Sequence, residues 1–444
     1  MSGFDRFLQR PTFVSSENTL ARFVARPVLR FIDREIASGV LLLIATATAL
    51  IWVNSPWGHT YGEFWHTDLE LLVGSWDLHL SLEHFVNDGL MALFFFVVGL
   101  EIKRELTTGY LSTMKDAALP AIAALGGMVV PALLFFALNP SGPASKGWGI
   151  PMATDIAFAV GIVALLGSRV SPRLKLFLLT LAIVDDIGAI AVIAIFYSEG
   201  FSLGWFLAAV GGLALVRGLQ GARVWAVMVY VLIGLFVWYA TLRSGVHATI
   251  AGVALGLLTP ARPLLPERDA QAVVDCLPDD ASVGEVRHAA FLVHESVPVT
   301  ERIENWLHPF TAYLIIPIFA LANAGIKISG DVLGDAISSN VVWGIILGLV
   351  VGKPVGITLF TWVATKFGFE LPAGINWGQY IGMAVAAGIG FTVAIFVSGL
   401  AFDVEALTAE AKIGILAASC IAGIGCIIIL AVNAVVDDDP DTHG

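Results

Sequence analysis

The sequence has few charged residues and few cysteines, and both shortages restrict what the chain can be. Only 14% of its 444 residues are charged, whereas 57% are hydrophobic, and the mean hydropathy is +0.84. A soluble domain carries about a quarter charged residues, so the composition excludes a soluble protein. The three cysteines, Cys276, Cys420 and Cys426, lack the spacing of metal ligands, which argues against zinc sites and a disulfide framework.

Two further signals are missing. No cleavable signal peptide is expected, because the first residues are polar and mildly basic and no long apolar run begins before about Ser38. The short alternating segments of a membrane β-barrel are largely absent. Instead, apolar runs of about 20 residues recur, and each is long enough to cross a bilayer. The sequence therefore predicts an all-α polytopic membrane protein whose first span directs insertion.

The apolar runs predict about twelve transmembrane helices. Their expected positions are 38–54, 84–101, 117–138, 148–167, 174–197, 203–217, 223–242, 245–260, 309–328, 340–366, 376–400 and 410–435. With this list, most Lys and Arg residues fall on one side, and the other side holds only Lys146, Arg243, Lys327 and Lys412. Because positive residues mark the cytoplasmic side, we expect both termini in the cytoplasm.

The same list divides the chain into regions. Residues 1–37 form a cytoplasmic N-terminal extension, in which apolar residues and arginines between 20 and 32 suggest an interfacial helix. Spans one to eight cover 38–261 and spans nine to twelve cover 306–436. Residues 55–83 form an external segment, and the alternation from Ser75 to Leu82 suggests one strand of a hairpin. A cytoplasmic loop covers 262–305, and an acidic cytoplasmic tail covers 437–444.

Two predicted spans are interrupted by glycine or proline, one in each half of the chain. Span four begins with residues 149–155 (GIPMATD), and span eleven contains residues 387–392 (AGIGFT). Paired interruptions of this kind indicate the binding site of a transporter. Glycine and proline are also common in ordinary membrane helices, so the functional interpretation depends on the polar residues beside the interruptions.

Asp185 and Asp186 lie in the middle of the apolar fifth span. A charge at that depth costs about 2.5–3.5 kcal/mol on insertion scales, which favours a functional role over a structural hydrogen bond inside the bundle. Neighbouring residues on a helix point about 100° apart. One aspartate can therefore face a water-filled funnel while the other faces a partner. The residues alone leave open which aspartate takes which role.

Four other polar residues accompany this pair. Lys353 lies inside span ten and needs a carboxylate partner, either Asp185 or Asp186, or it offsets the carbonyl ends of the broken span eleven. Asp155 lies beside the interruption in span four, where it would offset exposed N–H groups, and Thr154 adds a hydroxyl. Asp88 either lines the same cavity or caps the second span at the interface.

These groups suit the exchange of a small cation for protons. Carboxylates and exposed backbone carbonyls are hard oxygen ligands, appropriate for Na⁺ or Li⁺. Desolvation disfavours the anionic form of a carboxylate, so a proton and a metal ion compete for the same oxygens. If the empty, unprotonated site cannot cross the membrane, this competition couples the two fluxes.

The residues then match a known family, and the chain resembles the NhaA-type Na⁺/H⁺ antiporters. The resemblance runs in order over about residues 35–435. It is carried by residues 99–106 (GLEIKREL), 153–159 (ATDIAFA), 164–170 (ALLGSRV), 181–190 (LAIVDDIGAI), 244–252 (SGVHATIAG), 307–309 (LHP), 322–325 (ANAG), 352–354 (GKP) and 388–392 (GIGFT).

This resemblance implies an electrogenic antiporter of the cell inner (plasma) membrane that extrudes Na⁺ or Li⁺ in exchange for H⁺ and contributes to sodium and pH homeostasis. It implies inverted repeats, two interrupted helices that cross at mid-membrane, and an ion site of Asp185, Asp186, Thr154, Asp155 and Lys353. In this site we expect Asp185 to be the partner of Lys353 and Asp186 the more exposed cation ligand. Asp88 matches a cavity acid. Positions linked to pH response at the cytoplasmic side match Glu101, Lys103, Arg104, Glu105, His247 and Glu304. Membrane lipid and a homodimer through 55–83 are the expected partners, with no cofactor and no nucleic acid.

Two other functions fit the sequence less well. An intramembrane aspartyl protease needs two carboxylates that face each other at about 3 Å, which requires two helices, whereas Asp185 and Asp186 are adjacent on one. A channel needs rings of like residues or a repeated pore motif, and the sequence contains neither.

Overall fold

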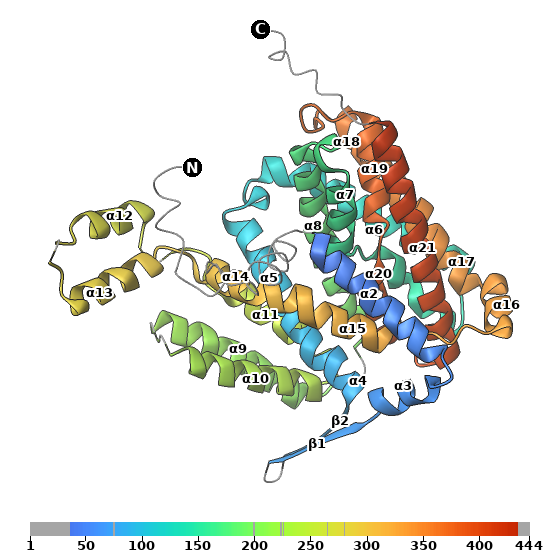
Figure 1. The fold of residues 1–444 in the computed structure, drawn as a ribbon, viewed down its shortest axis with the longest axis horizontal. Coiled ribbons are helices and arrows are strands. Elements are labelled where there is room, and N and C mark those ends of the chain that lie inside the picture. The colour runs from blue at the N-terminus through green and yellow to red at the C-terminus, as the bar shows by residue number, and fades with distance from the viewer. Residues whose placement is uncertain are drawn as a thin grey trace, which may run out of the picture.

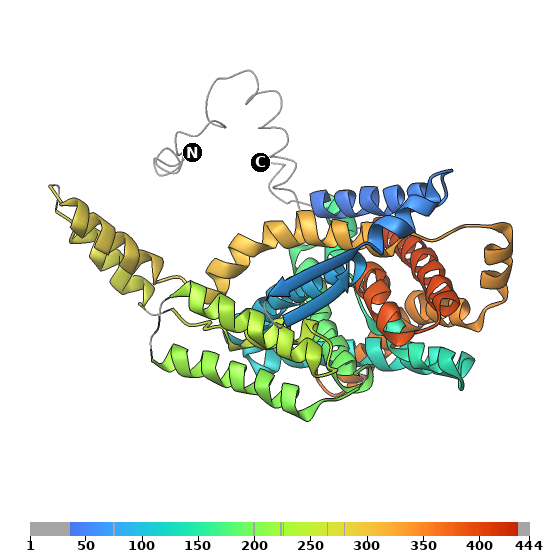
Figure 2. The same cartoon turned by 90° about the horizontal axis from the view of Figure 1, so that it is seen from below.

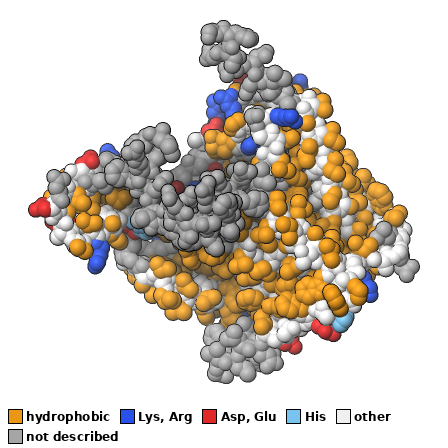
Figure 3. All heavy atoms as spheres, in the orientation of Figure 1, with side chains coloured by type: hydrophobic (Ala, Val, Ile, Leu, Met, Phe, Trp, Pro, Cys, Tyr) orange, Lys and Arg blue, Asp and Glu red, His pale blue; other side chains and the backbone are white. Residues whose placement is uncertain are grey.

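The computed structural model describes residues 36–433, apart from 74, 75, 199, 223, 225, 264 and 279. The described residues form a bundle of helices with one small β-hairpin (Figure 1). The expected interfacial helix at 20–32 and the acidic tail at 437–444 lie outside these residues. Hydrophobic side chains cover much of the described surface in Figure 3, as expected for helices that face lipid.

Among the described residues, seven continuous helical segments are long and apolar enough to cross a membrane. Four of them are the single helices α6 (Met114–Leu138), α8 (Pro172–Phe196), α9 (Leu203–Gly221) and α21 (Glu405–Val432). The other three each contain a π-helical turn. They are α4 (Leu82–His84) with Phe85–Leu90 and α5 (Met91–Thr107), α14 (Val299–Phe310) with Thr311–Ile315 and α15 (Ile316–Asn323), and α17 (Asn340–Leu347) with Gly348–Gly352 and α18 (Lys353–Lys366).

Three further apolar segments consist of two helices that meet at a bend. The helices α2 (Ile36–Val53) and α3 (Gly58–Trp65) meet at 115°, the 3-10 helix η6 (Pro143–Met152) and α7 (Ile156–Leu165) at 43°, and α19 (Trp377–Ala387) and α20 (Phe391–Ala401) at 43°. The shorter apolar helices are α10 (Val227–Arg243) and α11 (Thr249–Leu258). An apolar helix thus lies at every expected position, but length and composition support seven to ten spans, so the count of twelve stays a prediction.

The segment 262–305, expected as a cytoplasmic loop, contains the helices α12 (Glu267–Asp275) and α13 (Val283–His294) and the start of α14. The α13 helix begins with a capping box, in which Ser282 and Glu285 each bind the other's backbone N–H. The helix at the ninth expected span begins at Val299, before the expected position 309, and its first turns carry charged residues. It continues through Pro309 into the apolar part of the segment. The apolar run therefore located the part of this helix that can lie in the membrane, but not the residue at which the helix begins.

Short elements connect these helices. The strands β1 (Asp68–Val73) and β2 (Trp76–Ser81) form an antiparallel hairpin that projects from the bundle below α3 and α4 (Figures 1 and 2). In its register, Asp68 pairs with Ser81 and Val73 with Trp76. The remaining elements are α16 (Gly330–Ser338) and the 3-10 turns Tyr110–Ser112 and Gly167–Arg169.

Glycines permit the close helix packing that positions the site. Gly126 of α6 and Gly356 of α18 face each other so closely that a Cβ on either would overlap the carbonyl of the other. Small residues are the usual means of close approach between membrane helices. Because Lys353 lies one turn before Gly356 on α18, this contact holds Lys353 against α6 and the interior of the bundle.

Candidate ion site

The helix α8 carries the two aspartates into the interior. Its N-terminus is fixed by Ser171, whose hydroxyl accepts a hydrogen bond from the N–H of Leu174 at 3.2 Å, and proline occupies the first helical position. Asp185 is 1% exposed and Asp186 is 5% exposed. Both carboxylates are therefore buried inside the bundle, on a helix whose central part is otherwise apolar.

Asp185 is the aspartate that is paired. Lys353 Nζ lies 2.6 Å from its Oδ2, and the hydroxyl of Thr154 donates to the same oxygen at 2.7 Å. Lys353 is completely buried and follows directly on the π-helical turn Gly348–Gly352. It also donates to the carbonyl of Met152, the last residue of η6. Lys353 thus compensates a carbonyl end of the interrupted span four, and not of span eleven as one expectation had it.

Asp155 joins the two interrupted segments. Its Oδ1 accepts from the N–H of Phe158 in α7 at 2.9 Å. Its Oδ2 accepts from the N–H of Thr392 at 3.0 Å and from the Thr392 hydroxyl at 2.6 Å. One carboxylate therefore caps the N-termini of both α7 and α20, where the helix dipoles favour negative charge.

The backbone completes this junction. The N–H of Asp155 donates to the carbonyl of Ile389 at 2.7 Å. The Thr154 hydroxyl also lies 2.9 Å from the carbonyl of Ala387, so its single hydrogen is shared between this carbonyl and Asp185. The sequence did not assign roles to Thr392 or to the Met152 carbonyl. The position of Thr392 at the start of α20, opposite an acidic residue in the other interrupted span, is the signal that could have identified it.

Asp155→Asn is expected to destabilise the protein moderately, by about 1–3 kcal/mol, because the amide has one acceptor oxygen and leaves a buried N–H donor unsatisfied. Thermal unfolding of purified protein in detergent measures the change. Asp403→Asn is the matched control, since the Asp403 side chain is 76% exposed and lies 3.5 Å from Lys146, where exposed pairs contribute little. Equal stability of the two variants would contradict the capping role.

Carboxylate oxygens remain available for a cation. The Oδ1 atoms of both Asp185 and Asp186 are buried and have no hydrogen-bond partner among the described residues. In the same part of the chain, no group of three or more His, Cys, Asp or Glu side chains could hold a metal ion. A bound Na⁺ would therefore need these carboxylates together with hydroxyl, carbonyl or water oxygens, which are the ligands that hard cations prefer.

Four of the residues expected to act in pH response gather at one end of α5. Arg104 lies 2.5 Å from Glu304 of α14 and 3.6 Å from Glu105. Glu101 interacts electrostatically with these three residues, and Asp186 interacts with Glu101 in turn. Lys103 lies on the same helix but forms no ion pair with the described residues. The structure therefore brings four of the six expected residues together at this end of α5.

His247 and Asp88 lie at the opposite end of α5. The helices α5 and α11 run parallel, since Gly252 packs against Ala92 whereas Gly256 packs against Gly99. His247, which precedes α11, therefore lies beside the start of α5, where it interacts electrostatically with Asp88. The structure does not place His247 with Arg104, as the resemblance implied. The list of expected spans agrees with this separation, because spans two and eight run in the same direction and Arg243 falls on the side opposite to Arg104.

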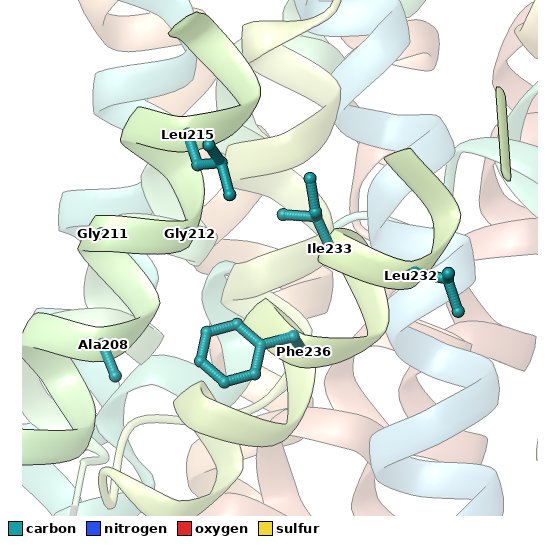
Figure 4. A pocket seen from close by; sticks show the side chains of 7 residues that line it. All are labelled: Ala208, Gly211, Gly212, Leu215, Leu232, Ile233 and Phe236. Atoms are coloured by element: carbon teal, nitrogen blue, oxygen red, sulfur yellow. The ribbon is translucent and has the colours of Figure 1, made fainter. Parts of the chain in front are cut away.

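One pocket in the described part of the chain lies elsewhere. Its volume is about 390 Å³, and its lining residues come from α9 and α10 alone. Figure 4 shows its side chains, which are all apolar. Without carboxylates or other polar ligands, this pocket offers nothing to a cation and has no part in the ion site.

Comparison with known proteins agrees with this chemistry. The family described as Na⁺/H⁺ antiporter 1 matches residues 29–430. The Na⁺/H⁺ antiporter NhaA 3 of Frankia alni is 46% identical over 412 residues, which cover 92% of this chain and 89% of the relative. The NhaA antiporter of Rhodopirellula baltica is 47% identical over 417 residues, or 91% of this chain and 94% of the relative. The chain therefore belongs to the NhaA-type family of Na⁺/H⁺ antiporters, which are membrane transporters.

Proposed function

We propose that this protein extrudes Na⁺ and Li⁺ in exchange for H⁺, electrogenically, and so contributes to sodium and pH homeostasis. Family membership supports sodium/proton antiport. The observation that carries the proposed mechanism is the buried pair Asp185 and Asp186, each with a carboxylate oxygen that no described residue binds. A carboxylate that holds a proton cannot also bind a cation with the same oxygen, so the two ions exclude each other.

The two aspartates have different roles in this mechanism. Asp185 is already held by Lys353 and Thr154, so its position is fixed. Asp186 forms no such ion pair with any residue that the structure describes, and it provides the oxygen that receives the entering cation. A cation beside Asp185 would also weaken the attraction of that carboxylate for Lys353, since both positive charges compete for it. The interrupted helices contribute hydroxyl and carbonyl oxygens from Thr154 and its neighbours.

We further propose the architecture in which this exchange operates. Twelve spans with inverted repeats place the crossing of the interrupted helices at mid-membrane, and both termini lie in the cytoplasm. The contact between Asp155 and Ile389 supports the crossing. Glu101, Arg104, Glu105 and Glu304 form the pH-responsive cluster, with Lys103 beside them. The hairpin within residues 55–83 connects two copies in a lipid-embedded homodimer.

The test is a measurement of ΔpH with a fluorescent dye in everted vesicles from a host that lacks its own Na⁺/H⁺ antiporters. We expect addition of Na⁺ or Li⁺ to move protons across the neutral-to-alkaline range, and K⁺ to have little effect. Membrane potential set by valinomycin and K⁺ should change the rate if exchange is electrogenic. No Na⁺-induced proton movement at any pH in this range would refute the proposal.

A further inference from the structure

Tyr197 links the helix that carries the aspartates to the first half of the interrupted span four. It follows the last residue of α8 and is 6% exposed. Its hydroxyl donates to the carbonyl of Lys146 at 2.7 Å and accepts from the N–H of Gly149 at 3.2 Å. Both of these backbone groups belong to η6, which begins at Pro143.

This contact reaches the ion site through a short path. Gly149 and Met152 are separated by one 3-10 turn, which rises about 6 Å. The carbonyl of Met152 binds Lys353. Thr154, two residues later, binds Asp185. Segment 149–154 is therefore attached to α8 at two points, by the Tyr197 hydroxyl at one end and by Asp185 at the other.

The fit around the hydroxyl is close. A Cβ on Gly149 would lie 2.7 Å from Tyr197 Oη, so only glycine allows η6 to approach this hydroxyl. The neighbouring residues Trp148 and Phe196 meet edge-to-face with ring centroids 5.1 Å apart. The carbonyl of Tyr197 also contacts His247 Nε2 at 2.6 Å, which connects the end of α8 to α11.

We propose that Tyr197 is a positioning residue for the ion site, whose hydroxyl fixes η6 so that the Met152 carbonyl and Thr154 stand at the correct distance from Asp185. This rests on the proposed exchange at Asp185 and Asp186. Without the hydroxyl, η6 can move along α8, and the oxygens around the cation are no longer preorganised. The effect should fall on cation affinity more than on the maximal rate.

The test compares Tyr197→Phe with Tyr230→Phe. Tyr230 lies on α10, and its hydroxyl also donates to a backbone carbonyl, that of Val224, at 2.9 Å. At equal amounts of folded protein, Tyr197→Phe is expected to raise the KM for Na⁺ about three- to tenfold with little change in maximal rate. Tyr230→Phe should leave both unchanged. An unaltered KM in Tyr197→Phe, or a loss confined to maximal rate and protein yield, would overturn the assignment.

A second measurement separates this inference from the proposed function. Hydrogen exchange followed by mass spectrometry should show faster exchange of peptides covering 143–153 in Tyr197→Phe than in the wild type or Tyr230→Phe, whether or not the protein transports Na⁺. In addition, Gly149→Ala should raise the KM for Na⁺ when it is introduced into the wild type. In the Tyr197→Phe background the same change should raise the KM much less, because the new methyl group occupies the space of the missing hydroxyl. If the two changes raise the KM additively and hydrogen exchange of residues 143–153 is unchanged in Tyr197→Phe, the Tyr197 hydroxyl does not position η6.

Discussion

Asp186→Asn is expected to abolish Na⁺-induced proton movement, with a loss of at least about a hundredfold in rate at moderate Na⁺ concentration. Two unit charges 4 Å apart attract by about 4 kcal/mol at an effective dielectric constant of 20, which corresponds to roughly a thousandfold in affinity. The amide keeps the size of the side chain but removes this charge. It also has no proton to exchange, so the competition between ions is lost together with the binding.

The measurement is the dye assay in everted vesicles, with the amount of folded protein matched by size-exclusion chromatography in detergent. Asp335→Asn serves as the control because Asp335 is exposed on α16, outside the ion site. Its rate should equal that of the wild type. Exchange that survives unchanged in Asp186→Asn would remove this residue from the ion site and leave Asp185 as the sole candidate of the pair.

Much of this site could be predicted from the sequence because a charge in an apolar span is costly enough to be informative. That argument identified Asp185, Asp186 and Lys353 without any knowledge of the fold. It also gave Lys353 a choice of carboxylate partners, and the distance of 2.6 Å to Asp185 decides between them. Glycine and proline located the interrupted spans, where the structure shows bends of 43° in both.

The rest depends on contacts between segments far apart in the chain. Asp155 caps α20 through Thr392. The interruption of span eleven draws attention to Thr392, but only the packing of the two interrupted segments shows that its N–H and hydroxyl bind Asp155. Tyr197 is an aromatic residue at the end of an apolar helix, where a position at the membrane interface is the ordinary expectation. Its role follows only from the place of Gly149 on another element. The resemblance grouped His247 with Arg104, whereas the parallel course of α5 and α11, which the alternating spans already predict, separates the two residues.

Lys353→Ala is expected to produce the largest loss of stability, about 3–5 kcal/mol, because removal of one partner leaves a buried charge uncompensated. Asp185 is 1% exposed and would keep only the Thr154 hydroxyl as a neighbouring donor, while the Met152 carbonyl would lose its donor. Thermal unfolding in detergent measures the effect. Lys366→Ala, on the same helix but exposed, removes an ammonium 5.3 Å above the Trp362 ring and should lower stability by no more than about 1 kcal/mol.

The double variant Lys353→Ala/Asp185→Asn then decides whether the ion pair itself is responsible. With both charges removed no uncompensated charge remains, and the amide oxygen at position 185 can still accept from Thr154. The double variant should therefore be more stable than Lys353→Ala alone, because the two changes are coupled through one contact. If the losses simply add, the role of Lys353 is to bind the Met152 carbonyl rather than to neutralise Asp185. Antiport must be measured in parallel, since a changed ratio of protons to Na⁺ in Lys353→Ala would mean that this lysine carries a proton as well as supporting the site.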